Sequence, residues 1–261
     1  MKVPLFQVDA FTDVVFAGNP AAVCPLTAWP PDSVMQSIAA ENNLSETAFF
    51  VAAGDVNELR WFTPTTEVKL CGHATLASGH VIMTEFDAAA SSVRFSTRSG
   101  QLVVSRGDAQ GYRMDLPAQA SSPADAPEGL AAALGMEPKA VWRAGEDYLC
   151  ELDSASEVVG LRPAMDALAS VAARGIIVTA PGEETDFCSR FFGPAVGVPE
   201  DPVTGSAHCA LAPFWAERLG KSRLTAAQLS RRGGRLVAEV AGARVILEAG
   251  CATYLRGTIE I

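Results

Sequence analysis

A stretch of about fifteen residues occurs twice in this chain, and this repeat constrains the fold more than any other feature. The copies span residues 60–74 and 190–207, and arginine, an aromatic residue, phenylalanine, proline and valine recur in both at identical spacing. After a three-residue insertion, the two turns that align are Cys71-Gly72-His73 and Thr204-Gly205-Ser206. A period near half of the chain is too long for a solenoid unit. The repeat therefore predicts two related lobes, each contributing one Gly-containing turn to a shared place.

The composition is that of a globular protein with an ample core. Of the 261 residues, 49% are hydrophobic and 19% are charged, which excludes a disordered chain. This length allows one large domain or two lobes, and the repeat favours two lobes. The net charge of −10 argues against nonspecific binding to nucleic acid.

The cysteines and the apolar runs indicate a cytoplasmic protein without a membrane partner. The six cysteines form no CxxC pair, a pattern typical of reduced thiols. We expect no signal peptide, because the first residues lack a charged region with a cleavage site. We expect no membrane span, because the chain has no 18-residue apolar stretch. We expect no metal site either, since the three histidines and the cysteines lack zinc spacing. Phosphate-loop and dinucleotide fingerprints are also missing.

The coarse pattern of elements predicts an α+β fold. The first lobe, residues 1–117, contains several short strands and one long helix from the first Gly turn to about Thr84. Residues 118–127 are small, polar and Pro-containing, which indicates a linker. The second lobe, residues 128–256, has strands and a helix from the second Gly turn to about Leu219.

Each Gly turn precedes a helix rich in alanine and leucine, which favours a binding role. The first amides of a helix have no intrahelical partners and carry the positive end of its dipole. Two such N-termini facing one cleft would hold a carboxylate without a metal. The alternative is that Gly72 and Gly205 only permit tight turns, but their paired occurrence favours a site.

Glu46 is a candidate general acid/base. It lies between Ser45 and a mostly apolar, strand-like run over residues 47–51. A carboxylate in such a place is costly unless it is paired or titrates nearer neutrality, and titration near neutrality is what acid/base catalysis requires. The alternative is a surface glutamate at the start of a strand.

Three residues of the turn segments have two interpretations each. His73 could exchange a hydrogen bond with a substrate, or it could cap or pack the helix. Asp201 could receive an amine or hydroxyl group, or it could form the turn before Pro202. Cys71 could be a nucleophile, because a thiol near a helix N-terminus can have a lowered pKa. The matching position in the second copy is Thr204, which favours a small buried residue instead.

Four blocks of the sequence together resemble the PhzF (phenazine biosynthesis-like) family. They are GNPAAV at 18–23, NLSETAF at 43–49, CGHAT at 71–75 and EDPVTGSAH at 200–208, in the family's order and over nearly the whole chain. The resemblance implies the diaminopimelate-epimerase-type α+β fold. Two pseudo-symmetric lobes would each wrap a mostly antiparallel sheet around a central helix, with the active site in the cleft between them. The final strand, residues 257–261, would return to the first lobe.

The resemblance also implies roles for individual residues. Glu46 would be the catalytic acid/base, and His73 and Asp201 would contact the substrate and assist proton movement. The residues implied in substrate binding are Asn19, Gly72, Thr204, Gly205 and Ser206. The family works without a cofactor, and a homodimer is expected.

The sequence therefore predicts a cofactor-independent isomerase that moves a proton on a small carboxylate-bearing substrate. One alternative is a cysteine-type amino-acid racemase or epimerase that uses Cys71, although such enzymes carry a cysteine in each Gly turn and Thr204 departs from that pattern. Another is a noncatalytic small-acid-binding protein. Solvent-deuterium exchange into the substrate separates an enzyme from a binder. The sequence reveals neither the substrate nor any role in phenazine biosynthesis.

Overall fold

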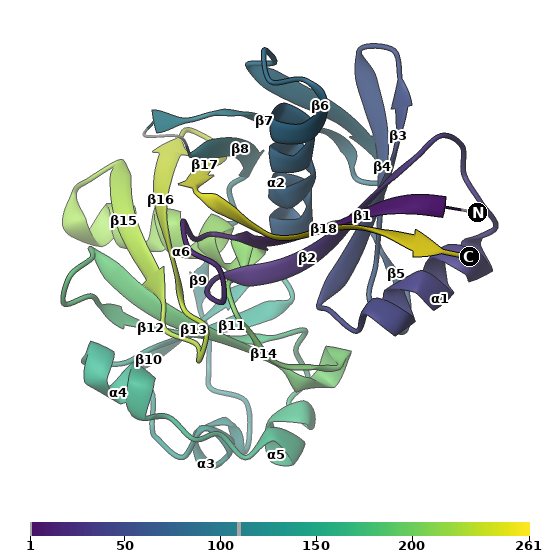
Figure 1. The fold of residues 1–261 in the computed structure, drawn as a ribbon. Coiled ribbons are helices and arrows are strands. Elements are labelled where there is room, and N and C mark those ends of the chain that lie inside the picture. Colours follow the sequence, from purple (N-terminus) through teal and green to yellow (C-terminus); the bar gives the residue numbers. More distant parts are fainter. Residues whose placement is uncertain (1, 109–110) are drawn as a thin grey trace. The chain divides into compact units, whose positions relative to one another are not determined.

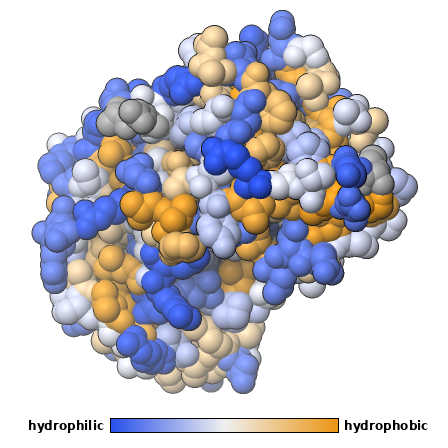
Figure 2. All heavy atoms as spheres, in the orientation of Figure 1, coloured by the Kyte–Doolittle hydropathy of each residue, from blue (hydrophilic) through white to orange (hydrophobic). Residues whose placement is uncertain are grey.

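Short strands around one buried helix make up each half of the chain. A computed structural model describes residues 2–108 and 111–261 and divides into two units. Unit 1 comprises Met1–Leu116 with Leu247–Ile261, and unit 2 comprises Pro117–Ile246. Both units are α+β, as expected. Hydrophilic residues cover much of the surface visible in Figure 2. In the described part of the chain, no helix has the length and apolar character to cross a membrane.

The described residues of unit 1 form mostly short strands. They are β1 (Lys2–Ala10), β2 (Asn19–Leu26), β3 (Glu46–Ala53), β4 (Val56–Phe62), β5 (Glu67–Val68), β6 (Ser92–Thr97), β7 (Gly100–Arg106), β8 (Tyr112–Pro117) and β18 (Cys251–Glu260). Its helical segments are α1 (Asp32–Asn42), α2 (Gly72–Val81) and the π-helix η1 (Ile82–Phe86) that continues α2. The helix expected to reach about Thr84 therefore ends as a wider helical turn.

Helix α2 is the central helix of unit 1. Every residue from His73 to Val81 is buried, and a helix buried on all sides belongs to the core. Gly79 allows the helix to approach β7 closely, because a Cβ there would lie 2.6 Å from a methyl group of Val104. Figure 1 shows α2 among the strands of this unit. This position fixes the start of α2, where the first Gly turn lies.

Unit 2 is built from the same kinds of elements. Its strands are β9 (Ser122–Pro123), β10 (Ala140–Ala144), β11 (Asp147–Glu151), β12 (Ile176–Pro181), β13 (Phe187–Gly193), β14 (Val198–Asp201), β15 (Arg223–Gln228), β16 (Gly234–Ala241) and the first part of β17 (Arg244–Ala249). Its helices are α3 (Leu130–Leu134), α4 (Ala155–Gly160), α5 (Met165–Ala169), the 3-10 turn η3 (Pro194–Val196) and α6 (Gly205–Leu219).

The two units have matching strand topology. β1 and β2 are antiparallel, as are β10 and β11, and the next pairs, β2–β3 and β11–β12, are parallel. The later pairs correspond as well: β3–β4 with β12–β13, β4–β6 with β13–β15, and β6–β7 with β15–β16. Helices α2 and α6 follow the short strands β5 and β14 in the two units. The internal repeat therefore extends far beyond the fifteen residues that reveal it.

The matching topology divides the strands into a first series, β1–β9, and a second series, β10–β18. The last strand of each series pairs with the first strand of the other series, an arrangement we call the strand exchange. β9 follows β8 along the chain but pairs with β10, and β18 follows β17 but pairs with β1 from Lys2 to Ala10. Figure 1 shows β18 running beside β1. This exchange explains two differences from the expected boundaries. The segment expected to link the lobes, 118–127, belongs to unit 2, and the returning segment begins at Leu247 instead of residue 257.

The arginine of each repeat copy forms a bidentate ion pair with a glutamate. Arg60 donates to both carboxylate oxygens of Glu67 at 2.8 Å, and Arg190 donates to both oxygens of Glu200 at 2.7 and 3.0 Å. The three-residue insertion places Glu67 opposite Glu200, so the two pairs are equivalent. Each guanidinium also lies over an aromatic ring, that of Phe62 or Phe192. The repeated arginine and phenylalanine therefore brace the segment that leads to each Gly turn.

Candidate active site

In unit 1, three reactive side chains meet at the start of α2. Glu46 begins β3, Cys71 is the N-cap residue of α2, and His73 lies in the first turn of that helix. The Nε2 atom of His73 lies 3.3 Å from Oε2 of Glu46, and its Nδ1 atom lies 3.5 Å from Sγ of Cys71. The imidazole ring therefore stands between the thiol and the carboxylate.

Burial determines the charge of the His73 imidazole. The side chain of His73 is 7% exposed, whereas that of Glu46 is 17% exposed. Burial lowers the pKa of His73 to about 3, so the imidazole is neutral near pH 7. The 3.3 Å contact lies within ion-pair distance, but Nε2 lacks the alignment of a hydrogen bond. We therefore regard Glu46 and His73 as close neighbours and not as a formed salt bridge.

Asn19 and Gly72 lie in the same unit as Glu46. Ala21 of β2 pairs with Glu46 of β3, and Asn19 precedes Ala21 by two residues, so these side chains share one face of the sheet. Asn19 is fully buried. Gly72 is the first residue of α2, whose amides are not capped by the Cys71 side chain. Those amides suit an anion, because the helix dipole is positive there.

In unit 2, the second Gly turn is held by a buried glutamine. Gln228, at the end of β15, accepts a hydrogen bond from the backbone N–H of Thr204 at 2.8 Å. Its amide nitrogen donates to the backbone oxygen of Asp201 at 2.8 Å. The hydroxyl of Thr204 donates to Oδ2 of Asp201 at 2.6 Å and does not cap α6. Asp201 and Thr204 are thus fixed together beside the first amides of α6, which begins at Gly205.

The hydroxyl of Ser206 joins a second polar network in unit 2. It accepts a hydrogen bond from Arg174 at 3.2 Å, and Arg174 also forms a bidentate pair with Asp147. Burial raises the pKa of Asp147, whereas the hydrogen bonds from Arg174 lower it. The network places a guanidinium within one hydrogen bond of the second Gly turn.

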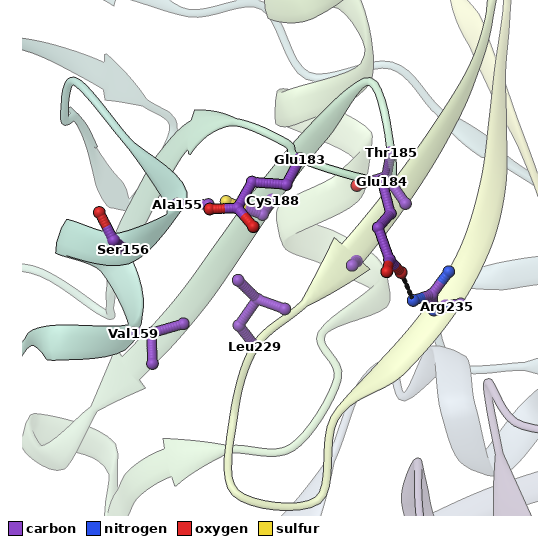
Figure 3. Close-up of a pocket in the computed structure, with 10 residues that line it drawn as sticks. Ala155, Ser156, Val159, Glu183, Glu184, Thr185, Cys188, Leu229 and Arg235 are labelled. Atoms are coloured by element: carbon purple, nitrogen blue, oxygen red, sulfur yellow. Dashed lines mark hydrogen bonds and ion pairs between the residues drawn. The ribbon is translucent and has the colours of Figure 1, made fainter.

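A separate pocket of about 300 Å³ also lies in unit 2. Figure 3 shows its apolar side, formed by Val159 and Leu229, with Glu183 and Cys188 above them. The ion pair between Glu184 and Arg235 closes one side. The residues that line this pocket include none of the candidate site residues. This pocket therefore gives no support to the candidate site residues, which are argued from their chemistry.

The structure thus groups the candidates within each unit. Glu46 and His73 are in contact, with Asn19 and Gly72 on neighbouring positions of unit 1. The unit 2 candidates are Asp201, Thr204, Gly205 and Ser206. Sequence reasoning missed the residues that hold the second turn, namely Gln228, Arg174 and Asp147. No local pattern marks them, because Gln228 and Arg174 lie far along the chain from the turn that they contact, and Asp147 acts only through Arg174.

Two α+β units of matching topology, each with a Gly turn at the start of a buried helix, define the epimerase-like fold class. A predicted epimerase from Pseudomonas aeruginosa shares this fold, with a TM-score of 0.75 at 19% identity over 98% of this chain and 99% of that chain. The chain belongs to the phenazine biosynthesis-like (PhzC-PhzF) family, whose model matches residues 8–258. The family expected from the four sequence blocks is therefore confirmed.

Relatives in this family are similar over their full length. An uncharacterized isomerase from Pseudomonas aeruginosa is 50% identical over 261 residues, which covers 100% of both chains. The crystal structure of a PhzF-family protein from Enterococcus faecalis has a TM-score of 0.97 and 41% identity, and it covers 100% of both chains. These similarities support the assignment of the chain to the isomerases as a general class.

Proposed function

We propose that this protein is a cofactor-independent isomerase that moves a proton on a small carboxylate-bearing substrate, with Glu46 as the acid/base. The observation that carries the proposal is the position of Glu46, whose carboxylate lies 3.3 Å from His73 at the start of α2. Its family relatives that are named isomerases support the reaction class. The side chain is mostly buried but retains 17% exposure, which gives a small ligand access to it.

In the proposed reaction, Glu46 takes a proton from a carbon of the substrate. The electron pair left on that carbon delocalises as an enolate-like anion, and Glu46 returns the proton to another carbon or to the opposite face of the same carbon. The uncapped amides of α2 would stabilise negative charge that develops in the transition state. The neutral imidazole of His73 would orient polar groups without adding a charge.

We also propose a ligand-binding role for the turn in unit 2. Asp201 keeps a carboxylate oxygen hydrogen-bonded to Thr204, which fixes its orientation, and it would receive an amine or hydroxyl group. The first amides of α6, from Gly205 and Ser206, would bind an anionic group. The guanidinium of Arg174, bonded to the Ser206 hydroxyl, adds positive charge nearby.

A cysteine-type racemase is the second candidate. The 3.5 Å contact between the Cys71 thiol and Nδ1 of His73 favours it, because an adjacent base is what activates a thiol. The position that matches Cys71 in unit 2 carries Thr204, which cannot serve as a second thiol. The Glu46 mechanism needs no second thiol, so we prefer it.

The test is solvent-deuterium exchange, applied first to a panel of small carboxylic acids and then to variants. Glu46→Gln keeps the shape of the side chain but removes the basic oxygen. We expect its exchange rate to fall by at least about a hundredfold, the lower end for general acid/base catalysis. Cys71→Ser should retain most of the exchange. Retained exchange in Glu46→Gln with loss in Cys71→Ser would replace this mechanism with the racemase mechanism.

We further propose a homodimer in the cytoplasm. The dimer is suggested by family membership alone, and sedimentation analysis of the purified protein tests it. The cytoplasm is supported by the six cysteines, all of which are thiols and therefore suit a reducing compartment. Fractionation of cells that express the tagged protein tests the compartment.

A further inference from the structure

Three different metal-ligand types converge at the start of α2. One ring nitrogen of His73, the sulfur of Cys71 and one oxygen of Glu46 all lie within 4.8 Å of one another. Cys71 and His73 come from the turn into α2, and Glu46 comes from β3. Proton transfer by Glu46 gives no task to the Cys71 thiol, so the proposed reaction does not account for this cluster.

The spacing of these atoms is close to that of a tetrahedral zinc site. Zinc bonds of about 2.0–2.3 Å place ligand atoms roughly 3.4–3.6 Å apart. The observed separations are 3.5 Å from Sγ of Cys71 to Nδ1 of His73 and 3.3 Å from Nε2 to Glu46. An ion can use only one of the two nitrogens, so the third ligand must shift by roughly an ångström to complete the set.

The ligand types select among cations. A thiolate and an imidazole suit zinc, whereas magnesium and calcium require oxygen ligands. A thiolate and a carboxylate together balance the two charges of the ion, which reduces the cost of holding it where Cys71 and His73 are buried. Three protein ligands leave a fourth position for water, the arrangement of an open zinc site.

We propose that Glu46, Cys71 and His73 form a binding site for a zinc-like divalent cation and that the bound ion inhibits the enzyme. Binding forms bonds from the ion to sulfur, nitrogen and oxygen, and the thiol proton leaves to solvent. Inhibition rests on the proposed function, because an ion on Glu46 occupies the oxygen that would take the substrate proton. Binding itself does not depend on that function.

Cobalt(II) titration of the full-length protein, stripped of metal with a chelator, tests the site. We expect one cobalt per chain, an intense thiolate-to-cobalt band in the near ultraviolet, tetrahedral bands in the visible region, and displacement by zinc. Magnesium should not compete. Cys71→Ser should lose the near-ultraviolet band, and Glu46→Gln should weaken cobalt binding, because it removes the carboxylate charge that helps to balance the ion.

Cys188 supplies the matched control. Its thiol is buried, and its pKa is raised mainly by this burial and also by the carboxylate of Glu183, which Figure 3 shows beside it. Cys188 lines the pocket of unit 2 described above, and the residues that line that pocket include no histidine. Cys188→Ser should therefore bind cobalt like the wild type, with the same near-ultraviolet band.

The possible outcomes distinguish failure of the cation site from failure of the proposed reaction. No cobalt binding by the wild type, or an unchanged band in Cys71→Ser with folding confirmed by circular dichroism, overturns the site. Loss of the band in Cys188→Ser overturns it as well. If cobalt and zinc bind as expected but the zinc-loaded protein still exchanges deuterium into its substrate, the binding site stands, the proposed inhibition is overturned, and Glu46 is not the base.

Discussion

The three histidines of this chain are all buried, and burial is the main cause of their lowered pKa values. The pKa falls to about 3 for His73 and to about 4 for both His80 and His208. His80 bridges Tyr112 and Thr253 through its two ring nitrogens. His208 bonds through Nδ1 to the backbone oxygen of Thr204. Each is therefore neutral in the folded state near pH 7.

These histidines should make the protein less stable in mild acid. Between the unfolded pKa near 6.5 and the folded value near 4, the unfolded chain binds protons that the folded chain does not. The free energy of unfolding should therefore fall as the pH drops from 6.5 toward 4, and it should be unaffected by these groups above pH 6.5. Each fully buried histidine should cost on the order of 2 kcal/mol at pH 5.

His208→Asn tests this prediction, because the asparagine amide can still donate to the Thr204 oxygen. Urea unfolding at pH 7 and pH 5 should show a smaller loss of stability for the variant than for the wild type. His80→Asn should behave in the same way in unit 1. If both variants lose as much stability in acid as the wild type, another group is responsible.

Single residues also mark the limits of sequence reasoning. The blocks around Glu46, His73 and Asp201 are contiguous in the sequence, so a local pattern was enough to propose them as site residues. The proposed cation site could not be predicted from sequence spacing, because Glu46 comes from a different element than Cys71 and His73. Only the pairing of β2 with β3 and the position of α2 bring them together.

At the scale of elements, the two Gly turns are held in different ways. In unit 2, Gln228 uses both ends of its side-chain amide to tie β15 to the segment before α6. Gln228 is 1% exposed, so its loss removes the side chain that accepts a hydrogen bond from the buried backbone N–H of Thr204. The second turn therefore depends on a strand that the sequence places after it.

Gln228→Ala should destabilise the protein measurably. Leaving a buried donor or acceptor unsatisfied costs about 1–3 kcal/mol, and the backbone N–H of Thr204 is one such group. The control is Gln101→Ala, at an exposed position of β7, which should change the stability by less than about 0.5 kcal/mol. Equal urea midpoints for the two variants would show that Gln228 does not hold the turn.

At the scale of the whole molecule, the exchanged strands decide which part of the chain can fold alone. The repeat predicted two similar lobes, and the matching strand order agrees with that prediction. The exchange itself was only partly visible, because short strands such as β9 carry almost no periodic signal. Backbone pairing, and not local sequence, makes residues 247–261 part of unit 1.

This topology predicts different behaviour for two fragments. Unit 2 is continuous from Pro117 to Ile246, whereas unit 1 needs the segment Leu247–Ile261. A fragment of residues 117–246 should therefore melt cooperatively. A fragment of residues 1–116 should not, because β1 loses its antiparallel partner β18 and exposes an unpaired edge. Fusing residues 247–261 to the 1–116 fragment through a flexible linker should restore a cooperative transition. Thermal melts followed by circular dichroism measure this. Cooperative melting of 1–116 alone would mean that β18 is dispensable for unit 1, and the exchange would then be a feature of connectivity without a role in stability.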